Sequence, residues 1–147
     1  MTDDTAPADQ ATSPPAWYWL VAVAALLFES AGAYLFANSL ALDPATLPLD
    51  QRVIYEATPQ WMNIAWALAI GSGVIGAVGL VMRRRFAEPL LLASLIAVAV
   101  QFSGLLLDKQ LRELTAEDQL IVPVVILLLA YGFWQAAKLA RRRGWLK

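Results

Sequence analysis

The stretch that most constrains the fold of this chain is Trp17–Ser39, WYWLVAVAALLFESAGAYLFANS. It is almost entirely apolar, carries one carboxylic acid near its middle, Glu29, and is followed by three further apolar runs. A helix of about 20 apolar residues crosses a hydrocarbon core of about 30 Å. The sequence therefore predicts an all-α integral membrane protein, a bundle of four transmembrane helices over residues 17–39, 60–82, 88–107 and 119–140.

The composition agrees with a membrane location and narrows the chemistry. Of the 147 residues, 59% are hydrophobic and 16% are charged, whereas soluble domains contain about 25% charged residues. The chain has no cysteine and no histidine, so it lacks a thiol nucleophile, the commonest general base and the commonest metal ligand. We therefore expect no enzymatic activity, no metal and no cofactor.

The chain divides into a tail and one membrane domain. Residues 1–16 are acidic and rich in proline, with little to bury, and are predicted to be a disordered tail. Residues 17–147 form the transmembrane domain. Within its connections, Leu49–Ala57 is predicted to form a short interfacial helix, and the charged stretch 108–118 is predicted to be largely helical, extending the third span.

A capping box is predicted at the start of the fourth helix. Thr115 is followed three residues later by Asp118, just before the last apolar run. In such a box the first side chain accepts a hydrogen bond from the backbone of the first helical turn. The sequence therefore predicts that Thr115 opens the fourth helix.

Positive charges predict the orientation of the bundle. Of the 11 lysines and arginines, eight lie in residues 83–85 and 138–147, while Arg52, Lys109 and Arg112 lie on the opposite side. Because cytoplasmic loops carry an excess of such charges, both termini are predicted to be cytoplasmic, as N-in/C-in in a bacterial inner membrane. The basic segments are also expected to contact anionic lipid.

Five tryptophans lie near the ends of the predicted spans. Indole rings favour the headgroup level of a bilayer, because there their apolar surface contacts lipid while their N–H group reaches water. Trp17, Trp19, Trp61 and Trp134 are predicted to be interfacial anchors, and Trp145 fits the same belt.

Glu29 is the candidate functional residue of the first span. On a helix of 100° per residue, Ala22, Ala25 and Gly32 lie on the same face as Glu29, whereas Leu27 and Tyr34 lie on the opposite face. A carboxylate facing lipid would cost several kcal/mol. We therefore expect this face of small residues to turn inward, or the acid to be protonated.

Gln101 in the third span is the predicted partner of Glu29. It lies on one helical face with Ser94 and Gly104, at a depth similar to that of Glu29, so a hydrogen bond between Glu29 and Gln101 is expected. Because the spans contain no Lys, Arg or His, the acid is expected to be neutral at pH 7 unless water reaches it. The preferred hypothesis makes Glu29 a structural acid that sets helix register, and the alternative makes it a proton or cation site.

The second span contains half of the eight glycines of the chain. Ser72 with Gly76, and Gly73 with Ala77, match the small-xxx-small pattern of closely packed membrane helices. Together with Gly32, these residues predict close helix contacts. The pattern leaves open whether the contacts form within one chain or between chains.

Two resemblances add to these predictions. The segments WYWLVAVAALL, NIAWALAIGSGVIGAVGL, RRRFAEPLLLASL and ARRRGWLK resemble a bacterial family of four-span inner-membrane proteins that often carry the label "sugar transporter". The segment ESAGAYLFANS is similar to the E-x-x-G-x-x-L-x-x-x-S spacing of the small multidrug resistance transporters, at Glu29, Gly32, Leu35 and Ser39. Both resemblances imply a four-span membrane protein, and their labels imply transport.

Two functions follow as hypotheses. The preferred one is a non-catalytic accessory or helix–helix interaction protein, because packing signals outnumber binding groups. Its partners would be the lipid bilayer and either further copies of the chain or another membrane protein, with no role for nucleic acid. The alternative is a small proton-coupled transporter that acts as an oligomer, with Glu29 as the titrating group.

Overall fold

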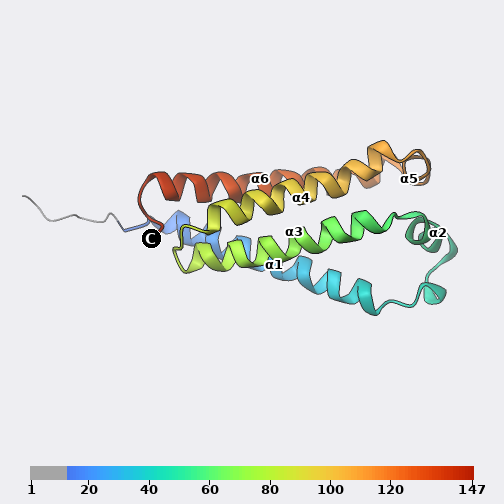
Figure 1. The fold of residues 1–147 in the computed structure, drawn as a ribbon, viewed down its shortest axis with the longest axis horizontal. Helices are drawn as coiled ribbons and strands as arrows, with labels where there is room; N and C mark the ends of the chain where they lie inside the picture. The colour runs from blue at the N-terminus through green and yellow to red at the C-terminus, as the bar shows by residue number, and fades with distance from the viewer. Residues whose placement is uncertain (1–12) are drawn as a thin grey trace, which may run out of the picture.

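The computed structural model describes residues 13–147 as a bundle of long helices joined by short ones (Figure 1). Four helices are long and apolar enough to cross a membrane. Their limits confirm the predicted spans to within two residues at every end. These helices are α1 (Ala16–Ala41), α3 (Gln60–Val81), α4 (Ala87–Leu107) and α6 (Ile121–Arg142). Residues 1–12 of the predicted disordered tail lie outside the described residues, and Ala16, the last residue of that predicted tail, is the first residue of α1.

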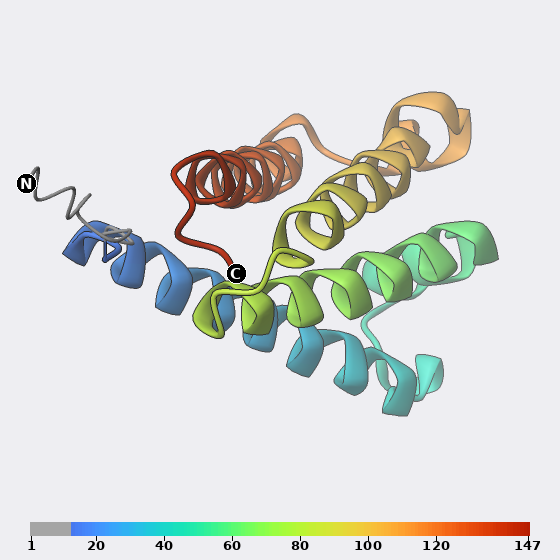
Figure 2. The same cartoon turned by 60° about the vertical axis from the view of Figure 1, so that its left-hand side comes forward.

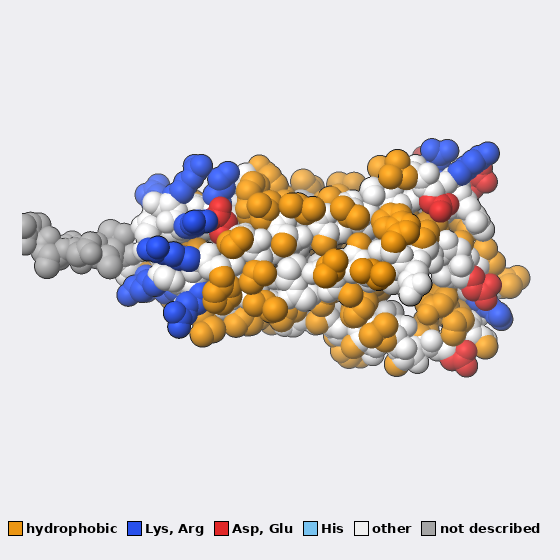
Figure 3. Space-filling view, in the orientation of Figure 1, with side chains coloured by type: hydrophobic (Ala, Val, Ile, Leu, Met, Phe, Trp, Pro, Cys, Tyr) orange, Lys and Arg blue, Asp and Glu red, His pale blue; other side chains and the backbone are white. Residues whose placement is uncertain are grey.

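The long helices pack in sequence order. α3 and α4 form the most extensive pair, α1 packs against α3, and α6 packs against α4. α1 and α6 lie close together at the end where α1 begins and α6 ends, and they diverge toward the other end (Figures 1 and 2). We call the first of these the basic end, because lysine and arginine side chains gather there (Figure 3), and the second the loop end.

The inward face of α1 is the one expected from the helical wheel. Ala22, Ala25 and Glu29 are buried, while Leu27 and Tyr34 are 66% and 67% exposed. Small residues at the buried positions allow α1 to approach its neighbours closely, which is how helices gain packing energy in lipid. Of the two alternatives expected from the sequence, an inward face or a protonated acid, the structure shows the inward face.

Gly73, Gly76 and Gly79 of α3 form contacts inside the chain, whereas Gly71 does not. A methyl group at Gly76 would lie 2.9 Å from the side chain of Leu91 and 3.1 Å from its backbone nitrogen, and one at Gly79 would meet Phe86. Ala77 is fully buried in the core. The small-residue pattern of the second span therefore allows α3 to pack closely against α4 and against the loop that joins the two helices.

The chain turns back on itself at the basic end. Gly144 has a positive φ of 71°, and the amide of Trp145 donates to the carbonyl of Ala140 at 2.9 Å, which together form a Schellman cap on α6. The turn carries Trp145 into the core, where it is only 7% exposed. The ring of Trp145, which the sequence placed in an interfacial belt, is therefore packed against other residues of the chain, because the left-handed glycine reverses the chain beneath the bundle.

The last residues are held against the loop between α3 and α4. Lys147 and the Arg83–Arg85 segment exchange two backbone hydrogen bonds, and the guanidinium of Arg83 donates to the carbonyl of Trp145 at 2.9 Å. Arg83 itself has a φ of 56°, a conformation that a non-glycine residue adopts at some cost. These bonds hold Arg83 in place and tie the C-terminal residues to the loop between α3 and α4.

Of the two short α-helices at the loop end, α2 agrees with its prediction and α5 agrees only in part. α2 (Leu49–Ala57) is the expected short helix. α5 (Lys109–Leu114) is helical but does not extend α4, because Asp108 has extended backbone and its side chain caps α5 by accepting from the amides of Gln110 and Leu111.

The predicted capping box is also wrong. The Thr115 hydroxyl donates to the carbonyl of Leu111 at 2.7 Å and so terminates α5. A short 3-10 turn, η2 (Glu117–Leu120), then leads into α6. Because the Thr115 hydroxyl is bonded to the preceding helix, α5, it does not cap the start of the fourth span.

Candidate functional site

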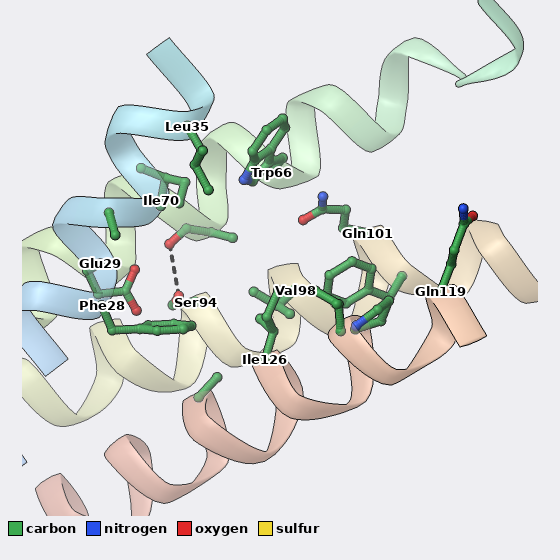
Figure 4. A pocket seen from close by; sticks show the side chains of 17 residues that line it. Phe28, Glu29, Leu35, Trp66, Ile70, Ser94, Val98, Gln101, Gln119 and Ile126 are labelled. Atoms are coloured by element: carbon green, nitrogen blue, oxygen red, sulfur yellow. Dashed lines mark hydrogen bonds between the residues drawn. The ribbon is translucent and has the colours of Figure 1, made fainter. Parts of the chain in front are cut away.

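A cavity of about 420 Å³ lies between all four long helices in the half of the bundle nearer the loop end (Figure 4). We call it the Glu29 pocket. It forms where α1 and α6 diverge, so that side chains from four helices face a space that none of them fills. Its polar lining residues are Glu29 from α1, Ser94 and Gln101 from α4, and Gln119 from the turn before α6.

Gly73 makes room for the Glu29 side chain because it has no side chain of its own. The carboxyl group of Glu29 lies against the backbone of α3 at Gly73, where an added methyl group would overlap all three carboxyl atoms. Glu29 is 4% exposed, and it lines the pocket (Figure 4). Gly73, predicted from the sequence as a helix-packing residue, therefore shapes the candidate site.

Glu29 takes part in none of the side-chain hydrogen bonds or ion pairs of residues 13–147, and its carboxyl oxygens keep some exposure to the pocket, since the fully buried polar side-chain atom without a partner in this part of the chain is Nε1 of Trp134. The ion pairs of the described chain lie elsewhere, between Arg52 and Glu56, Lys109 and Glu113, and Arg141 and Glu88. A carboxyl group that is buried without a partner lowers stability. Its presence is therefore not explained by packing alone.

The expected hydrogen bond between Glu29 and Gln101 is not formed, because the two helices are offset along the bundle. Ser94 of α4 donates to the carbonyl of Ala69 at 2.8 Å, and Ala69 precedes Gly73, which faces Glu29, by one helical turn. Gln101 follows Ser94 by two turns, which is about 10 Å of helix. Figure 4 accordingly places Glu29 and Gln101 toward opposite sides of the pocket.

The remaining wall of the Glu29 pocket is apolar. Phe28, Ile70, Val98 and Ile126 are among its apolar lining residues, and the Ser94 hydroxyl is already bonded to backbone. Pockets of this size with an apolar wall and few polar groups are typical of small-molecule sites. Glu29 can accept a hydrogen bond, exchange a proton or attract a positive charge.

The pocket has no second carboxyl group with which Glu29 could act as a pair. Among residues 13–147 there is no group of three or more acidic, histidine or cysteine side chains that could hold a metal. The chemistry of the site is therefore that of one intramembrane acid in an apolar cavity.

A second cavity, of about 760 Å³, lies at the loop end between α1, α2, α3 and α4. We call it the vestibule. It shares three lining residues with the Glu29 pocket, Trp66, Gln101 and Phe102. Trp66 was not identified from the sequence, although it precedes Gly73 by two helical turns on the same face of α3.

The predicted packing residues occupy different environments. Gly32 lies against Ile70 of α3, as a packing residue would. The Ser72 hydroxyl instead donates to the carbonyl of Leu68 in its own helix, at 2.6 Å, so Ser72 makes no polar contact between helices.

The predicted tryptophan anchors also divide into two groups. Trp17, Trp19 and Trp61 are 41–43% exposed and lie near helix ends, where interfacial anchors are expected. Trp134 packs against the core, with the Lys138 ammonium 4.8 Å from its ring centroid.

No protein family, curated protein or solved structure matches this chain. Over residues 13–147 the fold is that of an all-helical protein with four helices long and apolar enough to span a membrane. The two resemblances drawn from sequence segments stay predictions.

Proposed function

We propose that this protein is a small non-catalytic membrane carrier that binds a small ligand in the Glu29 pocket, with Glu29 as the titrating group. The observation that supports this proposal is the intramembrane carboxyl group of Glu29, which lines a cavity of about 420 Å³ and has no partner among residues 13–147. Acids within membrane spans are costly and are usually kept for ion, proton or substrate pathways.

Two observations weigh against the hypothesis that the sequence favoured, an accessory or helix–helix interaction protein in which Glu29 is a structural acid. A structural role for Glu29 required a hydrogen bond to Gln101, and that bond is absent. A helix–helix interaction function was suggested by the glycines of α3, and Gly73, Gly76 and Gly79 contact Glu29, Leu91 and Phe86 of the same chain. Carrier function accounts for both the unpaired acid and the cavity beside it.

A carbodiimide that partitions into membranes tests the titrating role of Glu29. Dicyclohexylcarbodiimide reacts with protonated carboxyl groups in apolar surroundings, so we expect one adduct per chain, found on Glu29 by mass spectrometry. The adduct should disappear in Glu29→Gln and persist in Glu113→Gln, whose carboxyl group is exposed on α5. Labelling should decline as pH rises, because the reactive protonated form is lost. Folded protein that gives no Glu29 adduct at any pH would contradict the proposal.

A pair of glycine substitutions tests whether the position of the carboxyl group matters. Compounds that protect Glu29 from the carbodiimide identify ligands, whose affinity can then be compared between variants. Gly73→Ala should displace the carboxyl group and weaken binding by about tenfold, or about 1.4 kcal/mol. Gly71→Ala is the matched control, because nothing lies within 4 Å of a methyl group at Gly71. Equal affinities in the two variants would contradict a role for the carboxyl position.

We also infer that the basic end faces the cytoplasm of a bacterial inner membrane. Eight of the 11 lysines and arginines belong to this end, and positive charge is retained on the cytoplasmic side. A reporter that is active only in the cytoplasm should therefore be active when fused after Lys147 and inactive when inserted between α1 and α2. The opposite pattern of reporter activity would contradict the inferred orientation and would leave the description of the fold unchanged.

A further inference from the structure

We propose that Glu29 is reached from the loop end through the vestibule, and that Trp66, Gln101 and Phe102 form the constriction that controls access. This inference rests on the proposed function, because it treats the Glu29 pocket as the site that is served. The three residues line both cavities, so they form the wall between the vestibule and the Glu29 pocket. The two cavities therefore adjoin at these side chains.

Trp66, one of the two aromatic residues of the constriction, is held in place by a neighbouring ring. The ring of Trp66 lies edge-on to Phe36, with centroids 5.0 Å apart and an interplanar angle of 77°. Phe36 itself lines the vestibule. Removal of the Trp66 ring should therefore widen the passage, while Phe36 and the surrounding helices remain.

The vestibule is suited to water and the Glu29 pocket is not. The vestibule is lined by the polar side chains of Ser39, Gln51, Thr58, Gln60 and Asn63. The Glu29 pocket has a mostly apolar wall. The lining thus becomes less polar from the vestibule to the Glu29 pocket, as expected for a route that begins in water at the loop end.

The charge at the loop end favours positively charged solutes. Residues 42–59 and 108–120 contain seven acidic and three basic side chains, a net charge of −4. A cleft of one charge sign raises the local concentration of oppositely charged solutes. Cations should therefore reach the vestibule, and Glu29 behind it, faster than anions.

The basic end is closed. The Tyr18 hydroxyl donates to the carbonyl of Leu80 at 2.6 Å in a buried contact, and Trp145 and Leu146 fill the space between α1, α3 and α6. The core at this end separates Glu29 from the arginine-rich surface. The structure therefore corresponds to a state in which the packed core blocks the way to Glu29 from the basic end.

The absence of cysteine from the chain allows a direct test with single cysteines in the full-length protein in lipid nanodiscs. Ser94→Cys places a thiol in the Glu29 pocket, Ser39→Cys places one in the vestibule, and Ala22→Cys places one in the closed core. The probes are trimethylammonium-ethyl and sulfonate-ethyl methanethiosulfonate, which have opposite charges and do not cross lipid. The rate of modification of each thiol is measured, with unfolding in SDS as the control that each thiol can react.

We expect the thiol of Ser94→Cys to react with the cationic reagent about tenfold or more faster than with the anionic one. Adding Trp66→Ala should raise that rate several-fold, whereas Trp61→Ala, which removes an exposed tryptophan of the same helix, should not. At a pH high enough to ionise the Glu29 carboxyl group, adding Glu29→Gln should reduce the preference for the cation. Ser39→Cys should react fastest, and Ala22→Cys should stay unreactive in the folded protein.

Two results would overturn the access route. In one, the Ser94→Cys thiol reacts with a lipid-soluble maleimide but not with the charged reagents, even with Trp66→Ala, which would indicate access between α1 and α6 from the lipid. In the other, it reacts with no reagent until the protein is unfolded, while Ser39→Cys reacts normally. Both results leave the carbodiimide experiment on Glu29 unaffected, so failure of the route and failure of the proposed function are distinguishable.

Discussion

Gly76→Leu is expected to lower the free energy of unfolding by more than about 3 kcal/mol, because it forces apart the most extensive helix pair of the bundle. Even the first atom of a side chain at Gly76 would lie 3.1 Å from the backbone nitrogen of Leu91. A backbone atom in α4 cannot rotate away as a side chain can, so the helices themselves must separate. Unfolding of the purified protein by SDS in mixed micelles, followed by circular dichroism, measures the change.

The matched control for this variant is Gly71→Leu. Gly71 lies in the same helix, five residues earlier, and nothing lies within 4 Å of a methyl group added there. Leucine also has a higher helix propensity than glycine by up to about 1 kcal/mol. Gly71→Leu should therefore leave stability unchanged or raise it. Equal destabilisation by the two variants would mean that α3 does not pack on α4 through Gly76.

Trp145→Ala is expected to lower the free energy of unfolding by about 3–5 kcal/mol, the range for large aromatic residues removed from a core. Trp145 is 7% exposed, and its ring lies edge-on to Trp17 and Tyr18 at centroid distances of 5.6 and 5.9 Å. Each such aromatic pair contributes about 0.5–1.5 kcal/mol beyond burial. The same SDS titration measures the loss.

The control for Trp145→Ala is Trp19→Ala, since Trp19 is 41% exposed near the same end. Trp19→Ala should have a much smaller effect on unfolding. Trp145→Ala should also open the closed end, so that a thiol in Ala22→Cys becomes reactive toward charged methanethiosulfonates. An equally stable Trp145→Ala protein with an unreactive Ala22→Cys thiol would show that the C-terminal turn does not close the bundle.

The sequence alone determined the features that depend on short segments. The four spans follow from the length of their apolar runs, and the buried face of α1 follows from the 100° spacing of Ala22, Ala25 and Glu29. The helix at Leu49–Ala57 was also predicted within its own segment. These features could be predicted because apolar length and helical periodicity are properties of neighbouring residues.

Only the tertiary structure decided which side chains meet. Gln101 lies about 10 Å along the bundle from the level of Ser94, and the axial offset between two helices is set by their packing. Trp145 is buried because Gly144 turns it beneath three helices, which no local pattern of apolar residues encodes. The Glu29 pocket exists because α1 and α6 diverge, and the angle between helices depends on contacts such as those of Gly73 and Gly76 with residues far along the chain.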